Sequence, residues 1–307
     1  MEVQFVWQQD FIKQYMRCPI YHDKYKIKIF VDHHPHGKKE KNHRWVFLQV
    51  ESGYLLNRSK KINKLMRNNS NIDLLLVFDQ KLLNLPNSVF FTTYAKSYYV
   101  NTPMDLEEDN CFFNYLSQRR KLKNFNESWL KRIDYKPENK KFKISMMCGV
   151  KKYLVGHIMR HKIWNMQNQI SNIPIVEFYY NAGDKKIKKY ATSKPIGLWR
   201  KNEIIEESKF HVCVENNRSK NYFTEKFIDC IATKTVPIYW GCNNIGDFFD
   251  LQGIIIIKDD KDFIKKVGKI TNKTYNNMLP YVLKNYETWK KMPSFHTQVV
   301  DALKRFD

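Results

Sequence analysis

The fold of this chain is indicated most clearly by residues 210–241, which read Phe210-His-Val-Cys-Val-Glu-Asn-Asn-Arg-Ser-Lys-Asn-Tyr-Phe-Thr-Glu-Lys-Phe-Ile-Asp-Cys-Ile-Ala-Thr-Lys-Thr-Val-Pro-Ile-Tyr-Trp-Gly241. Residues 210–214 form an apolar run typical of a buried strand, and a polar loop follows it. Residues 224–233 have helical periodicity, and residues 236–240 form a second buried strand. A strand, a helix and a strand in this order predict one unit of a parallel α/β sheet.

The same alternation of apolar runs and amphipathic stretches extends over the rest of the chain. Further strands are expected at residues 26–31, 45–50, 72–78, 89–93, 142–148, 175–180 and 253–257, and helices at residues 54–67, 157–170 and 283–306. A strongly charged stretch, residues 116–141, separates two such halves and resembles a linker. We therefore predict an α/β protein with two Rossmann-like domains that face one another across a cleft.

The composition is that of a folded, strongly basic protein. The 307 residues are 43% hydrophobic, and 53 Lys and Arg against 31 Asp and Glu give a formal net charge of +22. Such a chain can bury a core, which excludes a disordered tail. The charge favours anionic partners such as polyphosphates, nucleic acid or lipid surfaces without choosing among them, and most of the lysines could equally be solvated.

Several classes of protein do not fit the sequence. It contains neither G-x-x-x-x-G-K-[ST] nor G-x-G-x-x-G, which disfavours P-loop NTPases and dinucleotide dehydrogenases. No apolar run approaches the ~20 residues of a membrane span, and the first residues lack signal-peptide features. The six cysteines form no C-x-x-C pair, so we expect a cytoplasmic protein. Four histidines, His33, His34, His36 and His43, have only Asp32 beside them, and no metal site is expected.

The strand-helix junction of the opening stretch suits a nucleotide diphosphate. Ligands of open α/β sheets bind beyond the carboxyl ends of the strands, where a helix N-terminus presents free N–H groups. Lys226 supplies an ammonium for a diphosphate, and the Glu225 carboxylate could accept bonds from a ribose diol. Alternatively, Thr224 and Glu225 are only a helix cap and a first-turn dipole partner.

Residues 210–249 as a whole resemble the C-terminal signature of the α-1,3/1,4-fucosyltransferases, glycosyltransferase family 10. The shared motifs are a strand that ends in E-N, a helix start Y-x-T-E-K and a strand V-P-I-Y-W-G. The resemblance implies a GT-B fold and an inverting, metal-independent transfer from a GDP-sugar, with no cofactor besides this donor. It implies donor-binding roles for Tyr222, Glu225 and Lys226, with Glu215 and Asn216 lining the same strand end.

The family also uses an arginine on the first helix of the donor domain to neutralise the diphosphate. Arg160 is its counterpart here by position, and His157 and His161 flank it. The preceding Cys148-Gly149 departs from the S-N of the family, so Arg160 could also be one more cation in a lysine-rich chain.

The general base of the family follows a strand of the first domain, and Glu51 is the candidate here. An inverting transfer needs a base within hydrogen-bond reach of the acceptor hydroxyl. No proline follows Glu51 as it does in the family, and Glu51 could instead be a solvated residue at a helix start. Asp32 and Asp79, also at strand ends, are the fallback bases.

The resemblance assigns a role to each part of the chain. We expect residues 1–137 to bind the acceptor, residues 138–281 to bind the GDP-sugar, and residues 282–307 to pack back across both as a helical segment. The expected function is transfer of fucose from GDP-fucose to a hydroxyl of a glycan. Two alternatives stay open: another GDP-sugar, or a basic binding protein for nucleic acid or anionic surfaces on the same fold. We expect no specific nucleic-acid partner, and peripheral contact with an anionic membrane is a further expectation.

Overall fold

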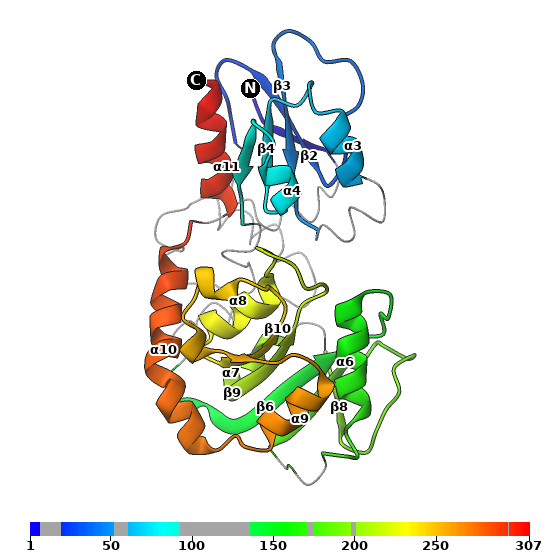
Figure 1. Cartoon of the computed structure of the whole chain (residues 1–307), viewed down its shortest axis with the longest axis vertical. Helices are drawn as coiled ribbons and strands as arrows, with labels where there is room; N and C mark the ends of the chain where they lie inside the picture. The colour runs from blue at the N-terminus through cyan, green and yellow to red at the C-terminus, as the bar shows by residue number, and fades with distance from the viewer. Residues whose placement is uncertain are drawn as a thin grey trace. The chain divides into compact units, whose positions relative to one another are not determined.

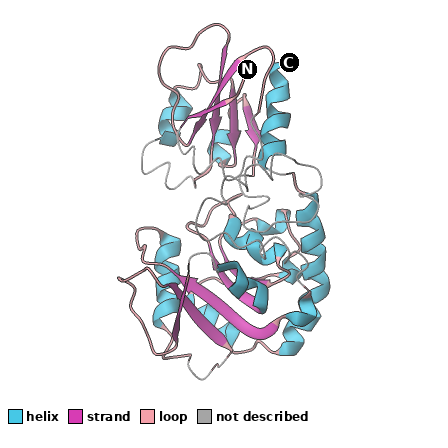
Figure 2. Cartoon of the chain, turned by 180° about the vertical axis from the view of Figure 1, so that it is seen from behind, coloured by secondary structure: helices cyan, strands magenta, loops and turns pink. Residues whose placement is uncertain are grey.

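The structure, a computed structural model, describes residues 1–6, 20–51, 61–92, 136–170, 173, 175–197, 201–293 and 295–307. The chain divides into two compact units (Figure 1). The first comprises Met1–Ile133, Lys220–Tyr222 and Pro293–Asp307, and the second comprises Asp134–Ser219 and Phe223–Met292. Each unit has its own parallel sheet and helices, which confirms the predicted α/β class (Figure 2).

The first unit is built on five parallel strands that lie in the order of the chain. They are β1 (Gln4–Val6), β2 (Lys26–Val31), β3 (His43–Leu48), β4 (Leu74–Val77) and β5 (Ser88–Phe90). The helices of this unit are α3 (Lys61–Arg67), α4 (Gln80–Leu83), α11 (Phe295–Leu303) and the short η7 (Lys304–Phe306).

Alternation along these strands divides the core of the first unit between the two faces of the sheet. Ile27, Ile29 and Val31 of β2 join a buried cluster with Phe295 and Val299 of α11. A second buried cluster, which contains side chains of β3, β4, α3 and α4, comprises Phe47, Leu65, Ile72, Leu75, Val77 and Leu82. Successive strand residues point to opposite faces, so helices pack on both sides of this sheet.

The second unit has a six-stranded parallel sheet in the order β11-β10-β9-β6-β7-β8. Its strands are β6 (Lys141–Cys148), β7 (Val176–Asn181), β8 (Ser193–Ile196), β9 (Ser208–Val214), β10 (Val236–Trp240) and β11 (Ile255–Ile256). Numbered within the unit, this is the order 3-2-1-4-5-6 of the Rossmann fold. The direction of strand addition reverses between β6 and β9.

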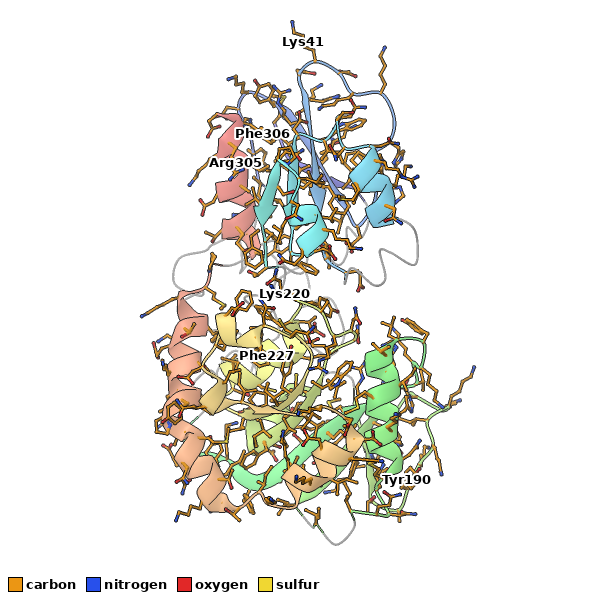
Figure 3. All side chains as sticks on the ribbon, viewed as in Figure 1. Lys41, Tyr190, Lys220, Phe227, Arg305 and Phe306 are labelled. Carbon is orange, nitrogen blue, oxygen red and sulfur yellow. The ribbon has the colours of Figure 1, made fainter. Side chains whose placement is uncertain are left out.

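Helices connect and cover the strands of the second unit. They are α6 (Val155–Asn165), α7 (Lys201–Glu207), α8 (Glu225–Ala232), α9 (Asp260–Val267) and α10 (Asn272–Lys291), with short turns η3 (Pro137–Asn139), η5 (Ile245–Asp247) and η6 (Leu251–Gly253). Helix α8, which carries the Phe227 side chain labelled in Figure 3, packs on β9 and β10. The ring centroid of Phe227 lies 4.7 Å from that of Tyr239. Helix α10 packs in turn against α8.

A buried lysine, Lys140, directly precedes β6 at the amino edge of this second sheet. The Lys140 ammonium donates to the Glu206 carbonyl at 2.5 Å and to the Thr235 hydroxyl at 2.8 Å. Burial lowers the pKa of Lys140 to about 7. It therefore joins the end of α7 to the start of β10 on the edge opposite to the expected donor site.

The structure moves several predicted boundaries. Strands β2 and β10 have the predicted bounds, whereas α6 begins two residues earlier than expected and ends at Asn165. The expected strand at residues 253–257 shrinks to two residues, because η6 takes the residues up to Gly253. Of the helix expected at residues 54–67, residues 54–60 lie outside the described part of the chain, as does most of the charged stretch 116–141.

The C-terminal segment differs most from the prediction. The expected domain end at residue 281 lies inside α10, which runs to Lys291 and belongs to the second unit. Helix α11 follows and belongs to the first unit. Residues 282–307 thus comprise the end of α10, whose buried side chains join the core of the second unit, and α11, whose buried side chains join the core of the first. Among the described helices, none is both long and apolar enough to cross a bilayer.

Candidate active site

The carboxyl ends of β6 and β9 are neighbours at the point where the strand order of the second unit reverses. Ligands of open parallel sheets bind at this switch point, beyond the strand ends. Helix α6 follows β6, and the loop into α8 follows β9. The chain therefore brings Arg160, Asn216 and the first turn of α8 to one edge of one sheet.

Arg160 is anchored to the end of β9 by two hydrogen bonds. Its Nη1 donates to the Val214 carbonyl at 3.1 Å, and its Nη2 donates to Asn216 Oδ1 at 2.8 Å. Burial lowers the pKa of Arg160, but a guanidinium still carries its charge at neutral pH. Two bonds orient a group that has five N–H donors, so Arg160 is a fixed positive charge at the switch point.

Gly156 allows α6 to approach β9 closely enough for these bonds. A Cβ atom at Gly156 would lie 1.7 Å from the Glu215 carbonyl oxygen, and the Gly156 N–H donates to the Asn216 carbonyl at 3.1 Å. Any side chain here would push the helix away from the strand. Asn216 therefore holds both the start of α6 and the guanidinium of Arg160, although it was predicted only to line the site.

Glu215, which directly follows β9, is fully buried. Its side chain is 0% exposed, and its two carboxylate oxygens accept hydrogen bonds from Thr224, one from the backbone N–H at 2.8 Å and one from the hydroxyl at 2.6 Å. Burial raises the pKa of Glu215. The Thr224 hydroxyl accepts in turn from the Lys226 N–H at 3.3 Å. Glu215 thus fixes the cap of α8.

Glu225 and Lys226 lie in the first turn of α8 and are both about one fifth exposed. The Lys226 ammonium donates to Glu225 Oε1 at 2.8 Å and to the Thr224 hydroxyl at 3.3 Å. Free N–H groups at a helix N-terminus add positive potential beside this ammonium. The turn can therefore receive an anion, with Lys226 exchanging its partner Glu225 for that anion.

The two histidines of α6 contribute differently to the site. His157 is 5% exposed, and its Nδ1 accepts from the Leu154 N–H at 3.3 Å. Burial and the neighbouring cations, Arg160 first, lower the pKa of His157 to about 4, so it is neutral at physiological pH. Burial also lowers the pKa of His161. His157 therefore supplies no positive charge at neutral pH.

Tyr222 is buried rather than displayed on the surface. It is 2% exposed, and its ring centroid lies 5.7 Å from that of Phe78. The preceding Asn221 donates from Nδ2 to the Phe78 carbonyl at 3.1 Å. These contacts explain why Lys220–Tyr222 are grouped with the first unit.

In the first unit, Glu51 follows β3 at the carboxyl edge of the sheet. Its backbone N–H donates to Asp32 Oδ2 at 3.0 Å, and its carbonyl accepts from Gln49 Nε2 at 3.2 Å. Asp32, predicted as a fallback base, is 3% exposed and already accepts from the Val50 N–H at 2.8 Å. Asp79, the other fallback, caps α4 by accepting from the Lys81 N–H at 2.9 Å. Both carboxylates therefore have structural partners.

Sequence reasoning missed two residues, Gly156 and Gln49, and one hydrogen bond that shape these sites. Gly156 could have been found, because a lone glycine inside a helical pattern signals close packing. Nothing local in the sequence marks Gln49, or the bond from Thr224 to Glu215, because both depend on contacts between separate strands or loops. Among the described residues, no three His, Cys, Asp or Glu side chains gather as a metal site, and metal independence stays a prediction.

Comparison with known proteins shows what the C-terminal half of the chain is similar to. Residues 154–305 match the family model Glycosyltransferase family 10 (fucosyltransferase) C-term. A stretch of 70 residues is 36% identical to the alpha-(1,3)-fucosyltransferase FucT of Helicobacter pylori. That stretch spans 23% of this chain and 15% of the H. pylori protein.

Solved structures resemble the chain over most of its length. The crystal structure of TarM matches with a TM-score of 0.54 at 14% identity, covering 92% of this chain and 55% of TarM. The crystal structure of an alpha1,3-fucosyltransferase with GDP-fucose gives a TM-score of 0.46 at 17% identity, covering 88% of this chain and 79% of that one. The likeness to TarM confirms the predicted GT-B fold class. Residues 154–305, which include Arg160 and the α8 cap, match the C-terminal domain of glycosyltransferase family 10, the fucosyltransferases.

Proposed function

We propose that this protein transfers fucose from GDP-fucose to a hydroxyl of a glycan acceptor, with inversion and without a metal ion. The observation that carries the proposal is the fixed Arg160 guanidinium beside the capped first turn of α8, at the switch point of a family 10 domain. Two cations and a helix N-terminus on one sheet edge suit a nucleotide diphosphate. The identity of a 70-residue stretch with an alpha-(1,3)-fucosyltransferase supports the choice of fucose as the transferred sugar.

The chemistry follows from charge that develops on the leaving group. The acceptor oxygen bonds to the anomeric carbon of the sugar while the bond from this carbon to the phosphate oxygen breaks, and its electron pair leaves with GDP. Arg160 and Lys226 stabilise this growing negative charge, which is the role a metal ion plays in other transferases. In the proposal, Glu51 takes the proton of the acceptor hydroxyl.

Nucleotide choice is the first test of the proposal. Thermal unfolding should be measured with GDP, UDP and CDP at equal concentrations. A ligand that binds only the folded state at 100 times its dissociation constant adds about 2.7 kcal/mol to the free energy of unfolding. We expect GDP to raise the melting temperature at concentrations where UDP and CDP do little. Equal stabilisation by GDP and UDP would contradict the assignment of the donor.

The proposed base is tested by Glu51→Gln, which preserves size and removes basicity. Transfer from GDP-fucose should fall by about 10²-fold or more in kcat, whereas GDP affinity should stay near that of the wild type. Wild-type kcat in this variant would exclude Glu51. Glu225→Gln is the complementary variant, and it should weaken GDP binding through the proposed ribose contact.

The two alternatives are separated by other measurements. Turnover with a GDP-hexose other than fucose, and none with GDP-fucose, would keep the enzyme and change the sugar. Steep, salt-dependent binding of nucleic acid without sugar transfer would favour a binding protein, since each neutralised phosphate steepens the salt dependence. Binding to anionic vesicles, compared with neutral vesicles, tests the membrane contact suggested by the net charge of +22.

A further inference from the structure

Two buried polar side chains converge on the backbone of Glu51. The first is Asp32, which follows β2, is 3% exposed and has a φ of 50°. This left-handed conformation costs roughly 1–2 kcal/mol for a residue with a side chain. The Asp32 carboxylate accepts from the Val50 N–H at 2.8 Å and from the Glu51 N–H at 3.0 Å. The left-handed backbone of Asp32 and its buried carboxylate thus both serve to bind the N–H groups of Val50 and Glu51.

The second side chain is Gln49, which is 0% exposed. Its Nε2 donates to the Glu51 carbonyl at 3.2 Å. Its Oε1 accepts from the N–H groups of Phe78 and Asp79 at 3.1 and 3.0 Å, at the end of the neighbouring strand β4. Gln49 therefore ties Glu51 to two strand ends at once.

We infer that Asp32 and Gln49 are positioning residues that hold Glu51 where it can take a proton from the acceptor. This inference rests on the proposed function. Asp32 binds the N–H of Glu51 and Gln49 binds its carbonyl, so both backbone polar groups of Glu51 are fixed from the interior of the sheet. A shift of about 1 Å in a reacting group can cost roughly 10²-fold in rate, so the placement of this backbone matters to the chemical step.

Asp73, which directly precedes the neighbouring strand β4, provides a matched control. It also accepts a backbone N–H of the β3 strand, from Trp45 at 2.6 Å, but at the amino end of the strand. Asp73 is about one fifth exposed and pairs with Lys39 at 2.7 Å. It therefore supports the fold of the first unit without reaching the carboxyl edge where Glu51 lies.

The test compares Asp32→Asn, Gln49→Met and Asp73→Asn with the wild type. Transfer kinetics, GDP affinity and the melting temperature are measured for each. For Asp32→Asn and Gln49→Met we expect kcat to fall by about 10-fold to 100-fold, with GDP affinity and the KM for the donor near wild type. Asp73→Asn should keep its kcat even if it melts earlier. A loss of kcat in Asp73→Asn equal to that in the other two would overturn the inference.

A double variant separates positioning from general support of the fold. If Asp32 acts only through Glu51, then Asp32→Asn should lower kcat little further once Glu51→Gln is present. An additional loss as large as in the wild-type background would overturn the inference, as would a wild-type kcat in both Asp32→Asn and Gln49→Met. If Glu51→Gln itself keeps wild-type kcat, the base assignment falls, and the positioning role falls with it. Absence of any transfer from GDP-fucose by the wild type would instead refute the proposed function.

Discussion

At the scale of single residues, the two cations of the second unit differ in how they are held. Arg160 is hydrogen-bonded to Val214 and Asn216 at the end of β9, whereas the partners of Lys226 within the described residues are groups of its own helix turn. An arginine offers fixed, forked donors and a lysine a mobile point charge. We therefore expect Arg160 to set the position of the diphosphate and Lys226 to follow its charge during transfer.

Replacing Lys226 by alanine should impair transfer and leave the fold intact. Loss of one preorganised cation should lower kcat by about 10²–10³-fold, the range found when one such donor is removed. Lys266→Ala is the control, because Lys266 pairs with Asp262 at 2.9 Å on the outer helix α9. Kinetics should be measured with and without EDTA. Turnover that stops on chelation and returns with Mn²⁺ would contradict the role of these cations.

The neutral state of His157 predicts a dependence of stability on pH. Burial and the nearby cations lower the pKa of His157 to about 4 in the folded protein, against about 6.5 in an unfolded chain. Between these values the unfolded state binds more protons, so the free energy of unfolding falls as the pH falls from about 6.5 to 4. Melting temperatures across this range should decline less steeply for His157→Gln than for the wild type. Parallel declines would show that another group causes the loss.

At the scale of elements, the α8 cap joins fold and site. The Thr224 hydroxyl accepts a hydrogen bond from the Lys226 N–H and donates one to the carboxylate of the buried Glu215. Chains of hydrogen bonds of this kind polarise one another, and a low dielectric strengthens them. Glu215, which follows β9, therefore fixes the first turn of α8 through Thr224. Val214 and Asn216, at the same strand end, bind Arg160.

Thr224→Val should weaken both stability and nucleotide binding. The variant loses the cap and one partner of a buried carboxylate, which together cost about 1–3 kcal/mol of the free energy of unfolding. GDP affinity should also fall, because the first turn loses its support. Chemical unfolding and GDP titration measure the two effects.

Thr271→Val supplies the matched control for this effect. Thr271 caps α10 by accepting from the Thr274 N–H at 3.3 Å, away from the switch point. It should lose about 0.5–2 kcal/mol of stability and keep its GDP affinity. Equal losses of affinity in both variants would show that the effect is global rather than local to α8.

At the scale of the whole molecule, each unit has its own hydrophobic core. The cluster of the second unit contains side chains of its sheet, α6, α9 and α10, whereas the main cluster of the first unit contains α11. The end of the chain thus completes the core of the unit where the chain began. Because the two buried clusters are separate, we expect each unit to have its own stability.

Phe295→Ala should destabilise the first unit selectively. The Phe295 ring packs edge-on against Phe91 with centroids 5.3 Å apart and is 2% exposed. Truncation should cost about 3–5 kcal/mol of the stability of this unit. GDP binding, which we assign to the second unit, should persist. Asp301→Ala, at an exposed ion pair on the same helix, should change stability by no more than about 0.5 kcal/mol. Loss of GDP binding in Phe295→Ala would show that the units do not fold independently.

Several local elements of this protein, and the family that its C-terminal half resembles, could be predicted from the sequence alone. The bounds of β2 and β10, and the cap of α8 at Thr224, follow from apolar runs and cap residues that interact with near neighbours. Such patterns are readable because the relevant contacts span only a few positions. The motif that begins at Phe210 is specific enough to indicate a family, and the model of that family matches residues 154–305.

Which of the polar residues at strand ends face inward depends on the tertiary structure and could not be predicted from the local sequence. Glu215 and Asp32 both stand at strand ends in the sequence, where a ligand or a proton would be expected to meet them. Folding instead buries each and commits it to the backbone of a distant segment, Glu215 to Thr224 and Asp32 to Glu51. Helix α11 is a further example, because its apolar face could pack in the core of either unit, and it packs in the core of the first unit. Which partner a buried polar group or an apolar face finds depends on chain crossings between strands, and local sequence does not encode these.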